Sequence, residues 1–220
     1  MRTPEIDYRT FRLSRINEPQ FRHLKLLLGW VVYLILYFLT ENLIPVERCT
    51  PVHCWLDDVI PFCEWFVIFY VSWYLLIVGS LGYFLLYNVD HFKKLQTYII
   101  MTQLIAMAVY IIFPNRQDLR PEVFPRDNLL TRLIGLIYAA DTNTGVCPSL
   151  HVAYSLGIAS TWLREKSVGK GFKTFIVVLV ILICLSVSFI KQHSTVDIFA
   201  AMGMCAFVEW FVFWRKKEKK

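Results

Sequence analysis

Six apolar runs separated by short polar segments constrain this chain more than any other feature. A transmembrane helix needs about 20 mainly apolar residues to cross the hydrocarbon of a bilayer. The runs that we interpret as such helices are residues 26–44, 65–87, 95–113, 149–163, 174–190 and 196–214. The fourth run is the shortest, and it contains His151. We therefore predict an all-α bundle of six transmembrane helices, folded as one domain over residues 1–220.

Charge is sparse and unevenly placed. Only 18% of the residues are charged, whereas about a quarter are charged in a soluble domain. Lysine and arginine gather in the tail 1–24, at 93–94, at 164–173 and at 215–220, which are alternate connections of a six-span chain. The positive-inside rule then places both termini in the cytoplasm. We expect a plasma (inner) membrane, with the basic tails against anionic lipid and no nucleic-acid partner for the net charge of +6.

The opposite face is predicted to hold the connections 45–64, 114–148 and 191–195. Four arginines lie in the second of these, where the rule predicts few, and they indicate a local anion: Arg116, Arg120, Arg126 and Arg132. Residues 127–140 carry one apolar stripe and are predicted to form a helix, capped by Asp127, that lies flat on the interface. A plain surface helix is an equal alternative. The first connection, 45–64, is interpreted as a lid.

A polar break at residues 186–197 separates the last two apolar runs. His193 and Asp197 stand four residues apart there, so on a helix their side chains share one face. A carboxylate beside an imidazole fixes the tautomer of the ring and supports a positive charge on it, which prepares a nucleophile or a base. The alternative is an interfacial histidine beside an acidic residue that favours the helix start.

A second polar segment, residues 141–152, precedes the fourth run. Gly145 and Pro148 are turn and helix-start signals, and Pro148 suits the first turn of a helix. The N–H groups around Ser149 would then point outward, as at helix starts that bind phosphate. His151 lies in the same turn. Ser149 as an ordinary cap and His151 as a buried, hydrogen-bonded residue are the alternatives.

These segments together resemble the type-2 phosphatidic acid phosphatase superfamily of six-span lipid phosphatases. That family has the motifs Lys-x6-Arg-Pro, Pro-Ser-x-His and Ser-Arg-x5-His-x3-Asp. The resemblance covers about residues 95–214, in the order of the family and between the expected spans. The matching positions are Arg120 and Pro121 for the first motif, Pro148, Ser149 and His151 for the second, and Ser186, His193 and Asp197 for the third.

Two positions depart from the family pattern. Phe113 stands where the first motif has lysine, and Val187 stands where the third has arginine. Arg116 and Lys191 lie nearby and are predicted to supply the missing charge to the phosphate. The thinned pattern, with its Lys-Gln-His run at 191–193, looks like the branch that contains inositol phosphorylceramide synthases, which transfer a phosphoryl headgroup.

The resemblance implies a mechanism that suits these residue types. His193 would attack phosphorus, oriented by Asp197, and form a phosphohistidine. His151 would protonate the leaving alkoxide, and Arg120 and Ser149 would hold the phosphate oxygens. No metal or cofactor is expected.

The expected function is metal-independent hydrolysis of a lipid phosphate monoester or pyrophosphate at the outer face. One alternative is a phosphotransferase between lipids. Another is a non-catalytic lipid-binding or transport protein on the same fold.

Three smaller features of the sequence also carry expectations. Cys49 and Cys54 are close enough in sequence for a disulfide in an oxidising compartment, with free thiols equally compatible. Gly79 and Gly82 are predicted to permit close helix packing. Glu209 lies deep in the last run and has no assigned role.

Overall fold

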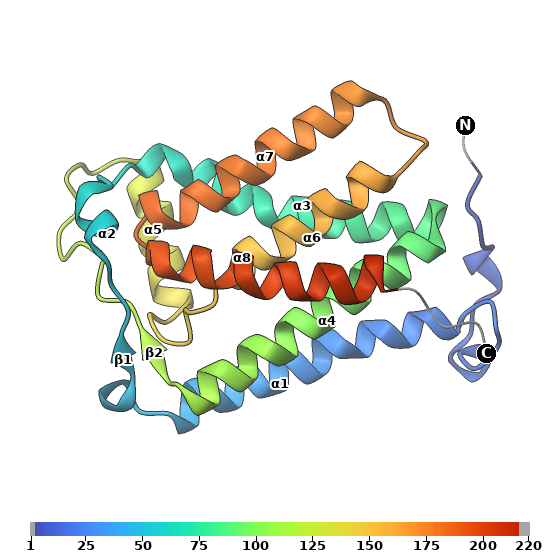
Figure 1. Cartoon of the computed structure of the whole chain (residues 1–220), viewed down its shortest axis with the longest axis horizontal. Coiled ribbons are helices and arrows are strands. Elements are labelled where there is room, and N and C mark those ends of the chain that lie inside the picture. The colour runs from blue at the N-terminus through green and yellow to red at the C-terminus, as the bar shows by residue number, and fades with distance from the viewer. Residues whose placement is uncertain (1–2, 216–220) are drawn as a thin grey trace.

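The computed structural model describes residues 3–215, and within them most of the chain is helical. Arg2 and the basic residues 216–220, which supported the predicted orientation, lie outside this part. The long helices run side by side along one axis (Figure 1). They are α1 (Leu28–Leu43), α3 (Val67–Tyr87), α4 (Val89–Ile112), α6 (Leu150–Arg164), α7 (Lys170–Phe189) and α8 (Thr195–Glu209).

Five helical segments are long and apolar enough to cross a membrane. They are Arg22–Leu43, Glu64–Tyr87, Val89–Ile112, Lys170–Phe189 and Thr195–Trp214. This bears out the prediction of an all-α membrane bundle. The remaining predicted span is α6, whose 15 residues would extend only about 22 Å, short of a hydrocarbon core of about 30 Å.

α6 is the central helix of the bundle. It packs against α3, α4, α7 and α8, and ten of its fifteen residues are buried. Small residues allow this crowding, because a side chain at Gly157 would collide with the ring of Tyr98 on α4. The prediction of close packing at Gly79 and Gly82 is wrong, since a Cβ at either position would meet no atom within 4 Å.

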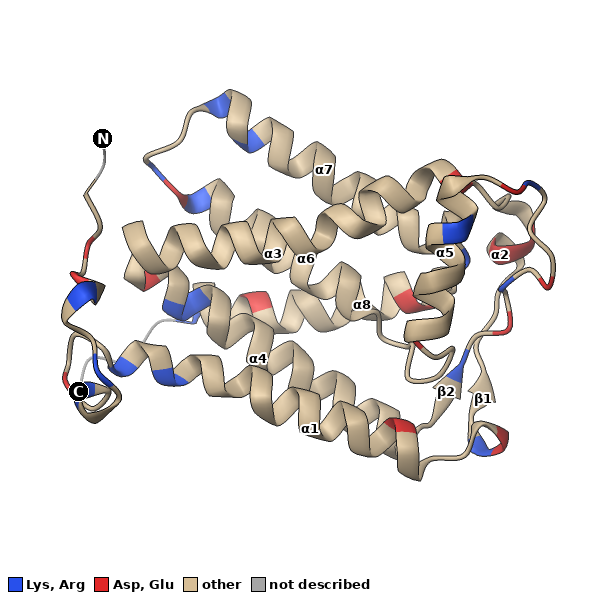
Figure 2. Ribbon diagram, turned by 180° about the vertical axis from the view of Figure 1, so that it is seen from behind, with Lys and Arg blue, Asp and Glu red and all other residues tan. Residues whose placement is uncertain are grey.

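Short elements close the end of the bundle at which the predicted outer connections lie. β1 (Thr50–Pro51) pairs in parallel with β2 (Asn115–Arg116). This strand pair joins the connections 45–64 and 114–148, and the sequence did not predict it. The helix α2 (Trp55–Val59) follows β1, and α5 (Leu129–Ala140) runs across the end of the bundle (Figure 2). Asn128 caps α5, not Asp127 as predicted, because its Oδ1 accepts from the N–H groups of Leu130 and Thr131.

The other end holds the N-terminal segment and the basic residues at 93–94 and 164–173 (Figure 2). The Tyr8 hydroxyl lies 2.8 Å from His23 Nε2 and donates to the carbonyl of Leu85, so this segment is anchored to the bundle. Glu209 binds Arg164 at 2.7 Å, which gives that acidic residue a partner on α6. The short helical turns of the chain are Tyr8–Thr10, Leu13–Arg15, Arg22–Leu27, Val46–Arg48, Glu64–Phe66 and the π-helical Trp210–Trp214.

Candidate active site

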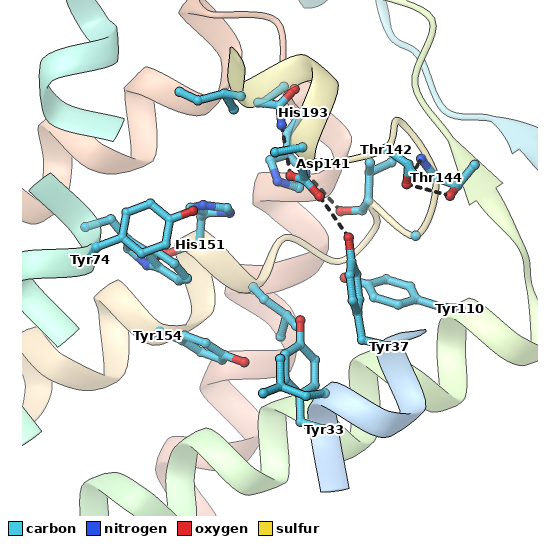
Figure 3. Close-up of a pocket in the computed structure, with 18 of the residues that line it drawn as sticks. Tyr33, Tyr37, Tyr74, Tyr110, Asp141, Thr142, Thr144, His151, Tyr154 and His193 are labelled. Carbon is cyan, nitrogen blue, oxygen red and sulfur yellow. Dashed lines mark hydrogen bonds between the residues drawn. The ribbon is translucent and has the colours of Figure 1, made fainter. Parts of the chain in front are cut away.

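A cavity of about 440 Å³ lies among α1, α3, α4, α5 and α6, and both predicted histidines, His151 and His193, line it (Figure 3). Three other lining residues are exposed on the outside of the molecule: Leu34 at 59%, Tyr74 at 55% and Leu136 at 68%. Each comes from a different helix, so the cavity reaches the lateral, largely apolar surface of the bundle.

His193 is held in place by the turn between α7 and α8. Lys191 adopts a left-handed backbone with φ of 56°, which reverses the chain. The N–H groups of Gln192 and His193 then donate to the carbonyl of Val187, at 2.9 and 3.0 Å. The side chain of Val187 is fully buried in an apolar cluster. The residue that stands where the resembling motif has arginine therefore packs in the core.

The predicted contact between His193 and Asp197 is confirmed. His193 Nδ1 lies 3.1 Å from Asp197 Oδ2 and 3.1 Å from the carbonyl of Val146. Both partners accept hydrogen bonds, so the proton belongs on Nδ1, and Nε2 carries a free lone pair. Asp197 has no exposed surface and also accepts the N–H of Ser194, so its carboxylate is fixed.

His151 lies beside His193 in an aromatic setting. Its ring centre is 4.5 Å from that of Tyr70, 4.1 Å from that of Trp73 and 5.7 Å from that of His193. Its Nε2 is buried without a hydrogen-bond partner among the described residues. The N–H groups of Leu150 and His151, which open α6, likewise have no acceptor within residues 3–215. A helix start with free N–H groups beside two histidines suits an anion.

Ser149 forms the N-cap of α6. Its Oγ accepts from the N–H of Val152, and its own N–H donates to the carbonyl of Asp197 at 3.2 Å. This second bond ties the start of α6 to the start of α8 and so sets the spacing of the two histidines. Ser149 is fully buried and does not line the cavity, so phosphate binding by its side chain stays a prediction.

Arg120 lies behind one wall of the cavity and binds the backbone of that wall. Its guanidinium donates to the carbonyls of Tyr138, Asp141 and Thr142 at 2.8–3.1 Å and stacks over the ring of Tyr138. Burial lowers the pKa of Arg120 from its usual value, although Asp141 opposes that effect. Arg120 therefore fixes the backbone that carries Asp141, and its direct contact with phosphate stays a prediction.

The structure does not bring Arg116 or Lys191 to the cavity, contrary to expectation. Arg116 Nε binds Asp118 at 3.0 Å, and its Nη1 donates to the carbonyl of Val46. Lys191 Nζ donates to the carbonyls of Asp57 and Ile60, because the left-handed turn aims it at the segment that contains α2. Burial lowers the pKa of Lys191, and the charges of Asp57 and Asp58 oppose the shift.

Asp57, which sequence reasoning missed, supports the turn that carries His193. It is buried and accepts hydrogen bonds from Ser194 Oγ at 2.5 Å, from the N–H and Oγ1 of Thr195 at 2.7 Å, and from the N–H of Cys54 at 2.9 Å. Burial alone would raise the pKa of Asp57, but the bonds from Ser194, Thr195 and Cys54 outweigh it, and the pKa lies below its usual value. The first connection thus anchors the start of α8.

Replacing Asp57 with alanine is expected to lower the free energy of unfolding. Each buried donor left without an acceptor costs about 1–3 kcal/mol. Thermal unfolding in detergent measures the effect. Asp58→Ala, an exposed neighbour with no contact to Thr195, is the matched control, and equal effects from both variants would contradict this role.

The stability contribution of Asp57 also has a defined pH dependence. Its pKa is lowered on folding, so the contribution is complete above the unfolded value of about 3.9 and is lost as the pH falls through the folded value. The difference in unfolding temperature between wild type and Asp57→Ala should therefore shrink in acid. A difference that stayed constant from pH 7 to pH 3 would contradict this linkage.

Among the described residues, neither a disulfide nor a metal cluster forms at the site. All six cysteines are free thiols, including Cys49 and Cys54. Within residues 3–215, no group of three or more His, Cys, Asp or Glu side chains is placed to hold a metal ion. Neither protein-family models, nor curated proteins, nor solved structures yield a match to this chain.

Proposed function

We propose that the chain breaks the phosphoester bond of a membrane lipid by attack of His193 on phosphorus. The observation that carries the proposal is the His193–Asp197 pair, which engages Nδ1 and leaves Nε2 for the substrate in a cavity that also contains His151 and the open start of α6. Activated nucleophiles of this kind pair with a buried group that orients them. The lateral position of the cavity suits a substrate whose acyl chains stay among lipids.

The proposed reaction has two balanced steps. His193 Nε2 forms a bond to phosphorus while the bond to the lipid oxygen breaks, and His151 gives that oxygen a proton, so that a lipid alcohol leaves. Water then attacks the phosphohistidine and gives its proton to His151, which releases the phosphate product and restores both histidines. The free N–H groups of Leu150 and His151 would stabilise the negative phosphate oxygens in both steps.

The proposal includes a topology with six spans and both termini in the cytoplasm. The basic connections at 93–94 and 164–173 lie at the end of the bundle opposite the cavity, which supports a site on the non-cytoplasmic face. In this topology α6 is the fourth of the six spans, shielded from lipid by its neighbours, and the membrane is the plasma (inner) membrane.

A phosphotransferase is the second candidate function. Among the described residues, no lysine or arginine lines the cavity, so a doubly charged phosphate monoester would meet no cationic side chain there other than a protonated histidine. A phosphodiester carries one negative charge and needs less compensation. In that case an acceptor hydroxyl would replace water in the second step.

The test measures lipid alcohol released by the purified full-length chain in vesicles with EDTA. The vesicles contain phosphatidic acid, phosphatidylcholine, phosphatidylethanolamine or phosphatidylinositol with identical acyl chains, with and without ceramide as acceptor. Diacylglycerol release that disappears in His193→Ala supports the proposal. No release from any lipid under either condition, or release that survives the substitution, contradicts it.

Replacing His151 with glutamine is expected to lower turnover of a lipid substrate by about 100- to 10,000-fold, because the alkoxide then leaves without a proton. A p-nitrophenyl phosphoester has a good leaving group, so formation of the phosphohistidine from it should be much less affected. The measurement is the burst of p-nitrophenol beside steady-state lipid turnover. His53→Gln, at an exposed histidine paired with Asp58, is the matched control. Equal losses on both substrates would exclude the general-acid role.

A further inference from the structure

One acidic side chain faces the cavity, and it plays no part in the proposed chemistry. Among the described residues that line the cavity, Asp141 is the only carboxylate, and no lysine or arginine accompanies it. A bare carboxylate beside a phosphate site repels the phosphate. Arg120, which lies behind the cavity wall, interacts with that charge, but inside the cavity the available source of a positive charge is the substrate itself.

Two hydrogen bonds hold the Asp141 carboxylate near the end of the cavity where His193 lies. Oδ1 accepts the hydroxyl of Tyr37 at 2.8 Å, and Oδ2 accepts Nε2 of Gln192 at 3.0 Å (Figure 3). Gln192 directly precedes His193, so the carboxylate and the nucleophile are joined through adjacent residues. Arg120 binds only the backbone carbonyl of Asp141, and within residues 3–215 no cation lies within 4.0 Å of its carboxylate. Each oxygen keeps a lone pair for another donor.

Among the described residues, seven aromatic side chains line the cavity. A substrate cation is attracted to ring faces within about 6 Å, and a desolvated site strengthens that attraction. A ring wall with one carboxylate is the environment that proteins use for ammonium groups. The aromatic lining residues are Trp30, Tyr33, Tyr37, Trp73, Tyr74, Tyr110 and Tyr154.

Resting on the proposed function, we infer that the substrate is a phospholipid whose headgroup carries a cationic amine, such as phosphocholine or phosphoethanolamine. The phosphate lies between His151 and His193, and the amine lies against Asp141 and the tyrosines. The group transferred to His193 is then the whole phosphorylated headgroup, and diacylglycerol leaves. Acyl chains extend past Leu34 and Leu136, which are exposed at the lateral surface.

The experiment compares lipids with identical acyl chains in vesicles, using the full chain and measuring diacylglycerol. We expect phosphatidylcholine or phosphatidylethanolamine to react at least about tenfold faster than phosphatidylinositol and phosphatidic acid. Asp141→Asn should lower kcat/KM for the amine-bearing lipid about 10- to 100-fold and leave phosphatidic acid unchanged or faster. Asp127→Asn, an equal charge change at an exposed residue of the same face, should change neither.

A second measurement probes the proposed amine site with a cation that carries no phosphate. Tetramethylammonium chloride should inhibit wild-type turnover of the preferred lipid, relative to sodium chloride at equal ionic strength, and should inhibit Asp141→Asn much less. The unfolding temperatures of Asp141→Asn and Asp127→Asn show whether each variant is folded. If Asp141→Asn is unfolded, Tyr37→Phe takes its place in the same comparison, because it removes one hydrogen bond to the carboxylate.

The outcomes separate this inference from the proposed function. Preference for phosphatidic acid or phosphatidylinositol, still dependent on His193, would overturn the inference and keep the proposed function. An equal loss on all lipids in Asp141→Asn, or equal inhibition by tetramethylammonium in both proteins, would also overturn it. No turnover of any lipid, with or without ceramide, would overturn both.

Discussion

Replacing His193 with alanine is expected to lower the rate of diacylglycerol release by about 10,000-fold or more. The reason is that the variant loses the atom that bonds to phosphorus, and the loss of a nucleophile is among the largest single-residue effects in covalent catalysis. His193 Nε2 is the free nitrogen of a ring whose Nδ1 binds Asp197, so no neighbouring group is prepared to replace it. The measurement is the rate of diacylglycerol release in vesicles under saturating substrate.

The control for this variant is His53→Ala, at an exposed histidine of the same end of the molecule. It should retain wild-type activity. The fold must survive in His193→Ala, which is checked by an unfolding temperature close to that of the wild type. A folded His193→Ala protein with a rate within tenfold of the wild type would contradict the assignment of the nucleophile.

Replacing Asp197 with asparagine is expected to lower the rate of the first step by about 1,000- to 10,000-fold. When His193 bonds to phosphorus, its ring becomes positively charged, and the buried carboxylate 3.1 Å away compensates that charge. Asparagine keeps the shape but removes the charge, and its amide group also competes to donate to Nδ1, which moves the ring proton to Nε2. Single-turnover measurement of diacylglycerol release isolates this step.

The matched control for Asp197 is Asp118→Asn, which changes the same atoms in an exposed pair with Arg116. Because the substitution acts on His193, the double variant Asp197→Asn with His193→Ala should be no slower than His193→Ala alone. Additive losses would mean that the carboxylate acts independently of the histidine, which would contradict its role in orienting and charging that ring.

Local sequence patterns were sufficient to place the centre of the candidate site. The contact of His193 with Asp197 follows from helical spacing of four residues. Ser149 is the N-cap of α6, as the alternative interpretation had it, and Pro148 lies before the helix and not in its first turn as predicted. Both features depend on residues close in the chain. Their meeting at one cavity follows from the order of the helices, which the hydropathy of most spans predicts.

The surroundings of the site depend on contacts between distant residues, which no local sequence pattern predicts. Asp57 binds Thr195 across 138 positions of sequence, and Lys191 binds two carbonyls of the same distant segment. Arg120 and Arg116 were expected at the phosphate because of their charge, but nearby segments present carbonyls and a carboxylate that bind them first. A charge pattern gives the face on which an arginine lies, and the partner it binds depends on the fold.

The hydropathy of the sequence also does not predict that α6 is buried. A helix surrounded by others needs small residues and tolerates hydroxyls, so Gly157, Ser155 and Thr161 reduce its apolar signal without exposing polar groups. The hydroxyls of Ser155 and Thr161 donate to carbonyls one turn earlier on the same helix. The candidate site residue His151 therefore lies on the helix with the weakest membrane signature.

The most direct test of the central claim is to capture the covalent intermediate on His193. The full chain is mixed with lipid carrying ³²P in the headgroup phosphate, quenched within the first turnover in alkaline detergent, and digested for mass spectrometry. Attack by His193 predicts stoichiometric label that resists alkali, is lost in acid, maps to His193 and is absent from His193→Ala. Diacylglycerol release during that first turnover without label on the protein, or label on another residue, would contradict it.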